Sequence, residues 1–597
     1  MDFLSSLFAG IVRQFSALNS TGIFSHGYTT AARALFVILA SFILLHSILS
    51  LIKSKSPSEV WAYFHIENGQ NIPVTHWENS IGRSKTCDLQ IDDLSVSRNQ
   101  GILTRNSRGE WTYMDLGSRN GAVINGKKVQ KDETVRVETG DEILIGGALC
   151  TLFPVSMEEH IRNVRERTAG THLMPPWVSL VLITIFQILT VFQLQIAMGD
   201  RYLPQITAAF FGMMVLMWVY TITLWAMKRR GFEIETIAFF LSTLSLAVVA
   251  TCLPGQVFKQ FAATAVGVVF FLLLCAVLRD LKRTLALKKI AYIGAAGLLI
   301  MNLIFASVKY GARNWIQIGG VSLQPSEIVK VAFIWVGAAT MEELFNRKNN
   351  LLFTGFSIFC FLCLAKMGDF GTAIIFFATF LVISFMRSGD FTKLIAVLGV
   401  AFVGGLLVLR FRSYVMERFL VWGHVWENAD KLGYQQTRTM SAAASGGLLG
   451  VGAGNGWLHN VAASQTDLVF GVVTEEWGLI IAVLAVLAIA TLSIFAYRTI
   501  LSGRSTYYTI AACATTALFL VQTILNVFGS VDILPLTGVT FPFLSYGGTS
   551  MVASWGLLAF LKAADTRRRA SLAVSEKSQG FEEKPGPSDE SGEEAAL

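Results

Sequence analysis

The sequence contains few charged residues for its length. Asp, Glu, Lys and Arg together make up only 15% of the 597 residues, whereas 53% are hydrophobic. Soluble globular chains carry about 25% charged residues, so this composition excludes an ordinary soluble protein. Many apolar stretches of about 20 residues are long enough to cross a bilayer as helices. The sequence therefore predicts a polytopic α-helical membrane protein.

The sequence also lacks a disulfide framework. Two of its seven cysteines lie in the polar stretch 56–155, and the other five lie within apolar stretches. Cys360 and Cys363 have a CxxC spacing, but no metal-ligating residue flanks them, so we interpret them as packing residues. We expect no disulfide.

The charge that is present is unevenly distributed. Residues 56–155 have the composition of a soluble module, and residues 565–597 form a polar tail, for which we predict disorder because its last part, from Gly580, is acidic and rich in Pro, Gly and Ser. The rest of the chain is apolar. We expect thirteen membrane spans, near residues 32–52, 175–198, 203–227, 235–254, 257–278, 289–308, 326–345, 351–366, 371–386, 391–410, 467–497, 507–528 and 548–564.

Basic residues fall in every second loop between these spans. Lys228-Arg229-Arg230 and Arg567-Arg568-Arg569 are two of the clusters, and the intervening loops carry fewer cations. Lys and Arg accumulate on the cytoplasmic side of membrane proteins. The sequence therefore predicts that the module 56–155 and the C-terminus face the cytoplasm, and that the loop 411–466 faces outward.

Short stretches of alternating polarity in the module indicate β-strands, and turn signals such as Asn125-Gly126 separate them. We predict an all-β sandwich. The order of Gly82-Arg83-Ser84, Ser97-Arg98-Asn99, the stretch 115–121 and Asn125-Gly126 resembles that of a forkhead-associated (FHA) domain.

The FHA resemblance implies recognition of phosphothreonine peptides by loops at one end of the sandwich. A guanidinium and a hydroxyl group suit a phosphate dianion. The residues implied to bind phosphothreonine are Arg83, Ser97, Arg98 and Asn120. Two positions depart from the family, because Gln100 stands where a His is usual and Ala122 where a Thr is usual. A scaffold that binds unphosphorylated partners is therefore a second hypothesis.

Four polar clusters lie in the predicted outward loops and the helix ends beside them, within residues 311–330, 367–373, 434–476 and 522–548. Their convergence on one face indicates a single extracytoplasmic site.

For two groups of charged residues in these clusters, the sequence suits either a structural or a functional role. Glu327 and Lys330 are i,i+3 neighbours, which suits either a structural ion pair or a site for an anion or substrate. Asp467 opens the predicted helix 467–497, where it suits either a chemical role or a helix N-cap. Glu475 and Glu476 lie further along that helix, and we expect a structural or gating role for them.

The ordered motifs R-x-W, QPSE-x-x-K, D-x-GTA, QQ with GGL-x-G, TD-x-x-F with EE-x-G, and PF-x-SYGG resemble the SEDS family (FtsW/RodA/SpoVE). The resemblance covers about residues 235–564, and it implies a core of ten spans. Two stretches depart from the usual family pattern, 462–468 and 366–369. The implied organisation is an anchor segment 1–55, an FHA domain 56–155, a linker 156–174, two additional transmembrane helices in 175–234, the SEDS core 235–564 and the tail 565–597.

The SEDS resemblance implies a peptidoglycan glycosyltransferase that polymerises lipid II on the outer face of the cytoplasmic membrane. Asp467 matches the family's essential aspartate and is the candidate base. Arg313, Lys330 or a divalent cation such as Mg²⁺ or Mn²⁺ could steady the departing pyrophosphate. The implied substrate-binding residues are Arg313, Trp315, Gln324, Glu327, Lys330, Asp369, Gln436, Ser545 and Tyr546.

The partners implied by these resemblances are lipid II, membrane lipid, a class B penicillin-binding protein and a phosphothreonine-containing protein. No nucleic-acid partner is expected. Two other hypotheses remain at this point: a transporter of the same lipid, and a catalytically inactive scaffold that recruits phosphorylated proteins. A transporter should spread its polar residues along a pathway, whereas here they gather at one face.

Overall fold

The structure is a computed structural model that describes residues 23–53, 60–85, 87–106, 109–131, 133–159, 161–162, 174–309, 312–318, 321–342, 347–388, 391–501 and 505–565. The N-terminal stretch 1–22, most of the predicted linker 156–174 and nearly all of the predicted disordered tail lie outside the described residues. The chain divides into two compact units. We call them the β-sandwich unit, within Ser58–Glu166, and the helical unit, formed by Met1–Pro57 and Arg167–Ala573.

The helical unit contains a helix at each expected span, which confirms a polytopic helical protein. Ten helices of the described residues are long and apolar enough to cross a membrane, and α12 is a shorter apolar helix. The helices at the expected spans, the ten together with α12 and the 17-residue helices α10 and α19, are α2 (Ile23–Lys53), α4 (Trp177–Met198), α5 (Pro204–Ala226), α6 (Glu233–Cys252), α7 (Val257–Leu278), α9 (Lys288–Phe305), α10 (Pro325–Met341), α11 (Arg347–Met367), α12 (Phe370–Ser388), α13 (Phe391–Phe411), α17 (Leu479–Leu501), α18 (Thr506–Ser530) and α19 (Gly548–Ala564).

One expected helix is broken, and the prediction of a continuous span at 467–497 is wrong. The chain remains a loop through Asp467, forms the short helix α16 (Val469–Trp477) and restarts as α17. Gly478 lies at the break with a φ of 91°, and a Cβ atom there would lie 2.3 Å from the Leu448 carbonyl oxygen. Only glycine tolerates this backbone angle and this close approach, which the apolar pattern does not reveal.

Helix α6 lies at the centre of the helical unit, and its whole span is buried. It packs against α2, α4, α5, α7 and α17. Its Glu235 Oε1 lies 2.8 Å from Lys562 Nζ of α19, and the Tyr220 hydroxyl donates to the same oxygen at 3.1 Å. A buried charge needs such partners, because an unpaired ion in an apolar interior is strongly destabilising.

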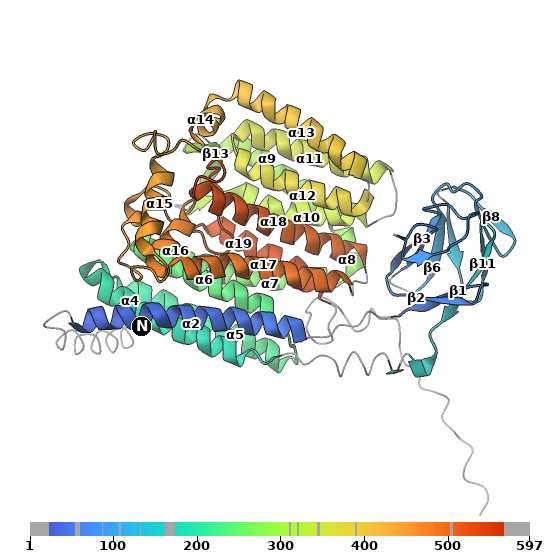
Figure 1. Ribbon diagram of the computed structural model, residues 1–597, viewed down its shortest axis with the longest axis horizontal. Helices are drawn as coiled ribbons and strands as arrows, with labels where there is room; N and C mark the ends of the chain where they lie inside the picture. The colour runs from blue at the N-terminus through green and yellow to red at the C-terminus, as the bar shows by residue number, and fades with distance from the viewer. Residues whose placement is uncertain are drawn as a thin grey trace, which may run out of the picture. The chain divides into compact units, whose positions relative to one another are not determined.

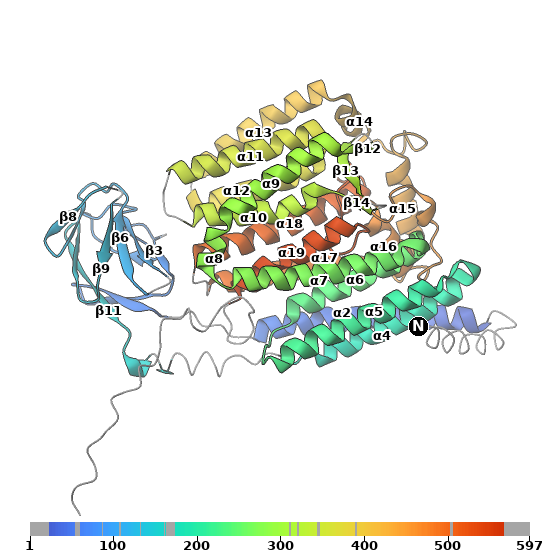
Figure 2. The ribbon, with the colours of Figure 1, turned by 180° about the vertical axis from the view of Figure 1, so that it is seen from behind.

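Helices α2, α4 and α5 run along one side of the helical unit (Figures 1 and 2). Helix α2 packs on α4, α6 and α17, and α5 packs on α7. Buried polar bonds join them to α6: Ser50 Oγ donates to Glu233 Oε1 at 2.7 Å, and Gln187 Nε2 donates to Thr243 Oγ1 at 2.9 Å. Because unsatisfied polar groups are costly in apolar surroundings, these bonds fix the positions of α2 and α4 along α6.

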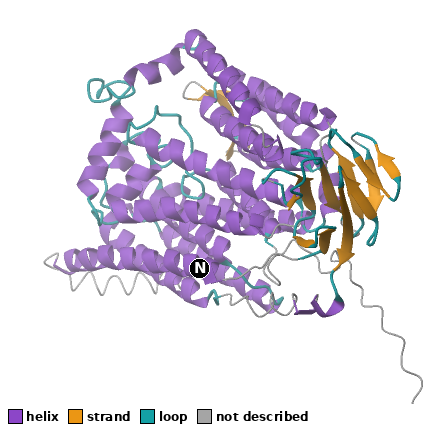
Figure 3. Ribbon diagram, turned by 45° about the vertical axis from the view of Figure 1, so that its right-hand side comes forward, coloured by secondary structure: helices purple, strands orange, loops and turns teal. Residues whose placement is uncertain are grey.

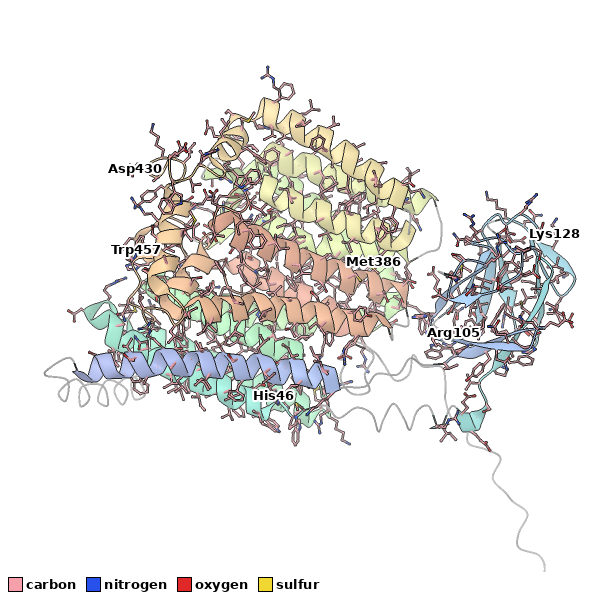
Figure 4. The ribbon with its side chains drawn as sticks, in the orientation of Figure 1. His46, Arg105, Lys128, Met386, Asp430 and Trp457 are labelled. Atoms are coloured by element: carbon pink, nitrogen blue, oxygen red, sulfur yellow. The ribbon has the colours of Figure 1, made fainter. Side chains whose placement is uncertain are left out.

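Much of the non-helical chain gathers at one end of the helical unit, the end with α14 (Ser413–Val421) and α15 (Tyr434–Gly446) in Figure 1. Figure 4 labels Trp457 at this end and His46 on α2 away from it. A three-stranded antiparallel sheet stands here where the sequence predicts a loop. Its strands are β12 (Ser307–Lys309), β13 (Ala312–Ile318) and β14 (Val321–Leu323).

The β-sandwich unit has two sheets, with strand orders β2-β1-β11-β10-β7-β8 and β4-β3-β5-β6-β9 (Figure 3). Apolar residues of both sheets, including Phe64, Leu103 and Ile143, share one buried core, so the predicted all-β sandwich is confirmed. The strands are β1 (Ala62–Ile66), β2 (Gln70–Val74), β3 (Glu78–Gly82), β4 (Leu89–Gln90), β5 (Gly101–Arg105), β6 (Trp111–Asp115), β7 (Ala122–Ile124), β8 (Lys127–Val129), β9 (Thr134–Val137), β10 (Glu142–Ile145) and β11 (Ala148–Pro154).

Candidate functional site

Asp467 lies in the loop that leads into α16. Its alternative role as a helix N-cap is contradicted, because Leu468 occupies the cap position and no side chain caps the helix. The Asp467 main chain is firmly bonded instead. Its N–H donates to the Ala463 carbonyl at 3.0 Å, and its carbonyl accepts from Asn526 Nδ2 at 3.1 Å. The fold therefore holds Asp467 through its backbone.

The Asp467 carboxylate is half-buried beside Gly538, where a Cβ atom would lie 3.4 Å from Asp467 Oδ2. Burial raises the pKa of Asp467 to about 6, opposed by the Thr466 hydroxyl and the Arg418 guanidinium, and the Asp369 charge raises it further. A carboxyl group with a pKa near neutrality can accept and return a proton under ordinary conditions.

Asp369 joins three of the predicted motifs. Its Oδ2 accepts from Asn314 Nδ2 at 3.0 Å and from Gln324 Nε2 at 3.3 Å, and its Oδ1 accepts from the Thr372 N–H at 3.1 Å. The last bond caps the start of α12, as short acidic side chains commonly do. Asp369 therefore ties β13 and the start of α10 to α12, and its charge acts on Asp467.

Glu327 and Lys330 form a buried ion pair. Lys330 Nζ lies 2.8 Å from Glu327 Oε1 and donates to Gln522 Oε1 of α18 at 3.2 Å. Gln522 Nε2 in turn donates to the Thr540 carbonyl at 2.8 Å. Lys330 is only 1% exposed. This geometry favours the structural alternative, because the ammonium group is already committed to protein acceptors.

Ser545 and Tyr546 clamp the loop that carries Asp467. Ser545 Oγ donates to the Thr466 carbonyl at 2.6 Å and accepts from the Phe541 N–H at 2.8 Å. The Tyr546 N–H donates to the Gln465 carbonyl at 2.8 Å. These bonds make the PF-x-SYGG segment a support for the neighbouring loop.

The other predicted substrate-binding residues lie at the same end of the unit. Gln436 of α15 is buried, and its Nε2 donates to the Gly529 carbonyl at 3.1 Å. Arg313 is exposed and Trp315 half-buried on β13. They flank Asn314, which contacts Asp369. Arg313 is therefore accessible to a ligand in a way that Lys330 is not.

Glu475 and Glu476 bind the loop that precedes Asp467. Glu475 accepts from the Trp457 N–H at 2.9 Å and from the Leu458 N–H at 3.0 Å, and Glu476 Oε2 accepts from the Gly454 N–H at 3.2 Å. Both glutamates are buried. These contacts support the expected structural role.

Sequence reasoning did not single out Arg418 of α14, whose charge acts on Asp467. Its Nη1 donates to the Leu536 carbonyl at 2.8 Å, two residues before Gly538. The only feature of the sequence that could have indicated Arg418 is that it is a cation in a loop predicted to face outward. Three amides that contact site residues lie in the predicted polar clusters, namely Asn314, Gln522 and Asn526. The sequence does not indicate which residues they contact.

The sequence predicts no particular residues as ligands of a divalent cation. Within the described parts of the chain, no group of three or more His, Cys, Asp and Glu side chains is placed to hold a metal ion. The charge of Asp369 acts on the Asp467 carboxyl group at this end of the helical unit.

The loops of the β-sandwich unit bring Arg83 and Ser97 together. The Arg83 N–H donates to the Ser97 carbonyl at 3.0 Å, and Ser97 Oγ accepts from the Arg119 N–H at 3.0 Å, which leaves the hydroxyl proton for another acceptor. Arg98 is exposed, and Asn120 Nδ2 donates to the Ser95 carbonyl at 2.7 Å. Asn120 therefore shapes the loop.

Gln100, the departure from the FHA pattern, braces these loops. It is fully buried. Its Oε1 accepts from the Ser97 N–H at 2.9 Å, and its Nε2 donates to Ser118 Oγ at 2.7 Å and to the Gly121 carbonyl at 2.8 Å. Ala122, the other departure, is buried in β7. An amide with both a donor and an acceptor thus holds the Ser97 loop against the loop that carries Asn120.

Comparisons with known proteins agree with both resemblances. A model of the FtsW, RodA and SpoVE family, described as cell cycle protein, matches residues 237–570, and an FHA-domain model matches residues 79–146. The peptidoglycan glycosyltransferase RodA of Mycobacterium leprae is 30% identical over 324 residues, which cover 51% of this chain and 68% of the relative.

The probable peptidoglycan glycosyltransferase FtsW of Lactococcus lactis subsp. lactis is 32% identical over 355 residues, which cover 51% of this chain and 83% of the relative. The crystal structure of the Thermus thermophilus rod shape determining protein RodA has 20% sequence identity and a TM-score of 0.42, and covers 55% of this chain and 94% of its own. Helices α2, α4 and α5 lie before the matched region.

Proposed function

Because the chain belongs to the FtsW/RodA/SpoVE family of cell cycle proteins, we propose that it is a peptidoglycan glycosyltransferase that polymerises lipid II. Asp467 is its catalytic base. The observation that carries this assignment is the environment of Asp467, a half-buried carboxylate with a pKa of about 6, held by its backbone at the end of the unit where the family motifs converge.

The reaction joins the free sugar 4-hydroxyl of one lipid-linked disaccharide to the anomeric carbon of another and expels a polyprenyl pyrophosphate. Asp467 accepts the proton of the attacking hydroxyl as the new glycosidic bond forms and the bond to the pyrophosphate breaks. Placement of the two substrates accounts for much of the remaining barrier.

A cation is needed near the departing pyrophosphate, because negative charge develops on its oxygen atoms. Arg313 is exposed on β13, and Arg418 is exposed beside the loop that contacts Asp467. A guanidinium group suits phosphate oxygens because its donors form a planar fork. Lys330 is buried and bonded to Glu327 and Gln522, so in this proposal it supports α10 and α18 rather than the pyrophosphate.

The distribution of basic loops supports an orientation in which the end that carries Asp467 faces outward and the β-sandwich unit faces the cytoplasm. In that arrangement the protein polymerises glycan outside the cell and receives signals inside it. Arg83 and Ser97, with Arg98 exposed nearby and Asn120 shaping the loop, bind a phosphothreonine-containing protein. A class B penicillin-binding protein, as the cross-linking enzyme, is the expected partner of the glycan polymerase.

Polymerisation of purified lipid II by the full-length protein in detergent micelles tests the catalytic assignment. We expect glycan chains from the wild type, and a loss of about 100-fold or more in Asp467→Ala, because general base catalysis contributes about 10²–10⁴-fold. Asp430→Ala is the matched control, since Asp430 is an exposed acid in the preceding loop. A transporter forms no polymer in micelles, so polymer from the wild type also separates the two activities. Equal rates for Asp467→Ala and wild type would sink the assignment.

A further inference from the structure

We propose that the added helices α2 and α4 are a positioning element of the enzyme, which holds the loop between Gly450 and Asp467 in its working place. The inference rests on the proposed function, since it is Asp467 that gives this loop a catalytic task. The region matched by the family begins at residue 237, so α2 and α4 are additions to the family core. In the sequence, α2 precedes the β-sandwich unit.

The first contact is an aromatic cluster at the end of α16. The Trp477 ring is 4.7 Å from Phe36 of α2, edge to face, and 5.3 Å from Phe186 of α4, stacked. Phe36 and Phe186 are themselves 4.9 Å apart. Trp477 is the last residue of α16 before the break at Gly478. The added helices therefore enclose the point at which α16 turns into α17.

The second contact is with the loop itself. Gln193 Nε2 of α4 donates to the Ala453 carbonyl at 3.3 Å, and both residues are buried. At Gly452, with a φ of 100°, a Cβ atom would lie 2.7 Å from the Thr29 methyl group of α2. The loop can pass this close to the added helices only because it has no side chain there.

A continuous run of bonds leads from this contact to the catalytic residue. The α16 glutamates hold the loop at Gly454, Trp457 and Leu458. The Val461 N–H then donates to the Leu458 carbonyl at 2.9 Å, and the Ser464 N–H donates to the Val461 carbonyl at 3.2 Å. The last bond of this series is the one that the Asp467 N–H donates to the Ala463 carbonyl.

Such a run transmits small displacements because each turn is packed and bonded to the next. A general base is sensitive to them, since a misplacement of about 1 Å can cost as much as about 100-fold in rate. Loosening the contact with α2 and α4 should therefore lower kcat and leave binding of lipid II, which other loops share, largely unchanged.

Two variants of the full-length protein test the proposal. Phe36→Ala removes the ring against Trp477, and Gln193→Leu removes only the bond to Ala453 at similar side-chain size. Phe42→Ala is the matched control, because Phe42 lies on the same helix and is 57% exposed. For each protein we would measure kcat and KM with lipid II, the pH dependence of kcat, and hydrogen exchange of the backbone at 450–467.

We expect Gln193→Leu to lower kcat by about tenfold with KM within about twofold of wild type, and Phe36→Ala to do at least as much. Exchange at 450–467 should rise about threefold or more in both variants and remain unchanged in Phe42→Ala. Greater hydration of Asp467 should also move the acid limb of kcat to lower pH, which a mere loss of folded protein would not do.

Hydrogen exchange separates this inference from the proposed function. A wild-type protein without polymerase activity would contradict the function, while faster exchange in the variants would still support the positioning role. Unchanged exchange at 450–467 in both variants, together with unchanged kcat and pH dependence, would overturn the inference.

Discussion

The two units hold their functional loops in different ways. In the β-sandwich unit the buried Gln100 amide bonds two loops, with help from Asn120 and the Arg119 N–H, and Arg83 remains half-buried at their surface. In the helical unit many motif residues share the task by bonding to one another or to backbone groups, as Lys330 does with Glu327. Asp467 differs from them because its backbone bears the structural contacts.

This difference separates motif residues that build a site from those that can act on a ligand. A side chain whose polar atoms are used by the fold, such as Lys330 or Gln100, should matter mainly for stability and loop placement. One whose polar atoms remain available, such as Asp467 or Arg83, should matter mainly for chemistry or binding. Substitutions in the two classes should therefore produce opposite balances of stability and activity.

The largest change in stability is expected from Lys330→Met. It leaves Glu327 buried without its partner, and breaking one side of a buried pair costs about 3–5 kcal/mol. The measurement is thermal unfolding of the purified protein in a fixed detergent. The double variant Glu327→Leu/Lys330→Met removes both charges and should recover most of the lost stability. If Lys330→Met unfolds like wild type yet fails to polymerise lipid II, Lys330 belongs with the ligand-binding class.

A binding defect without a stability defect is expected from Arg83→Ala. Hydrogen bonds to charged groups contribute about 1.5–3 kcal/mol, so affinity for a phosphothreonine peptide should fall about 10–150-fold. Titration of the full-length protein with phosphorylated and unphosphorylated forms of one peptide gives the measurement. Arg136→Ala is the matched control, because Arg136 is 65% exposed on β9. Equal binding of both peptide forms by the wild type would favour the scaffold that recognises unphosphorylated partners.

Loss of the bonds made by the Gln100 side chain should lower both the stability of the β-sandwich unit and its affinity for a phosphopeptide. Gln100→Leu leaves the buried Ser97 N–H without an acceptor, at a cost of about 1–3 kcal/mol, and should lower the unfolding temperature of the β-sandwich unit and the phosphopeptide affinity together. Gln100→His restores the residue usual in the family. Its imidazole can accept from Ser97 only while neutral, so its affinity relative to wild type should fall below about pH 6.5. A pH-independent ratio would show that residue 100 does not bear on the phosphate site.

Much of this arrangement can be predicted from sequence. Hydrophobic length indicates each long helix, and α19 has the predicted bounds 548–564. The break at Gly478 could not be predicted, because it depends on the approach of Leu448 from a distant part of the chain. The i,i+3 spacing indicated that Glu327 and Lys330 are neighbours, but their link to Gln522, 192 residues away, follows only from the packing of α10 on α18. Arg418 was missed for the same reason.

The smallest effect concerns the charges around Asp467. Its pKa of about 6 lies above the usual 3.8, so the folded state holds the proton more tightly than the unfolded chain. The stability contributed by this group is therefore full below pH 3.8 and is lost as pH rises through about 6. Activity should have the opposite dependence, because Asp467, as the proposed base, works only when deprotonated. The rate should fall about tenfold per pH unit below about 6 and level off above it.

Two charges near Asp467 allow the acid limb of the pH–rate profile to be moved to higher or to lower pH. Arg418→Gln removes a cation that lowers the pKa of Asp467, so the acid limb should move to higher pH, whereas Asp369→Asn removes an anion and should move the limb to lower pH. The Arg418→Gln shift should be modest, because Arg418 is exposed and solvent screens its charge. High salt should therefore shrink the Arg418→Gln shift. Opposite movements of one limb in the two variants would assign it to Asp467, and a limb that neither variant moves would belong to another group.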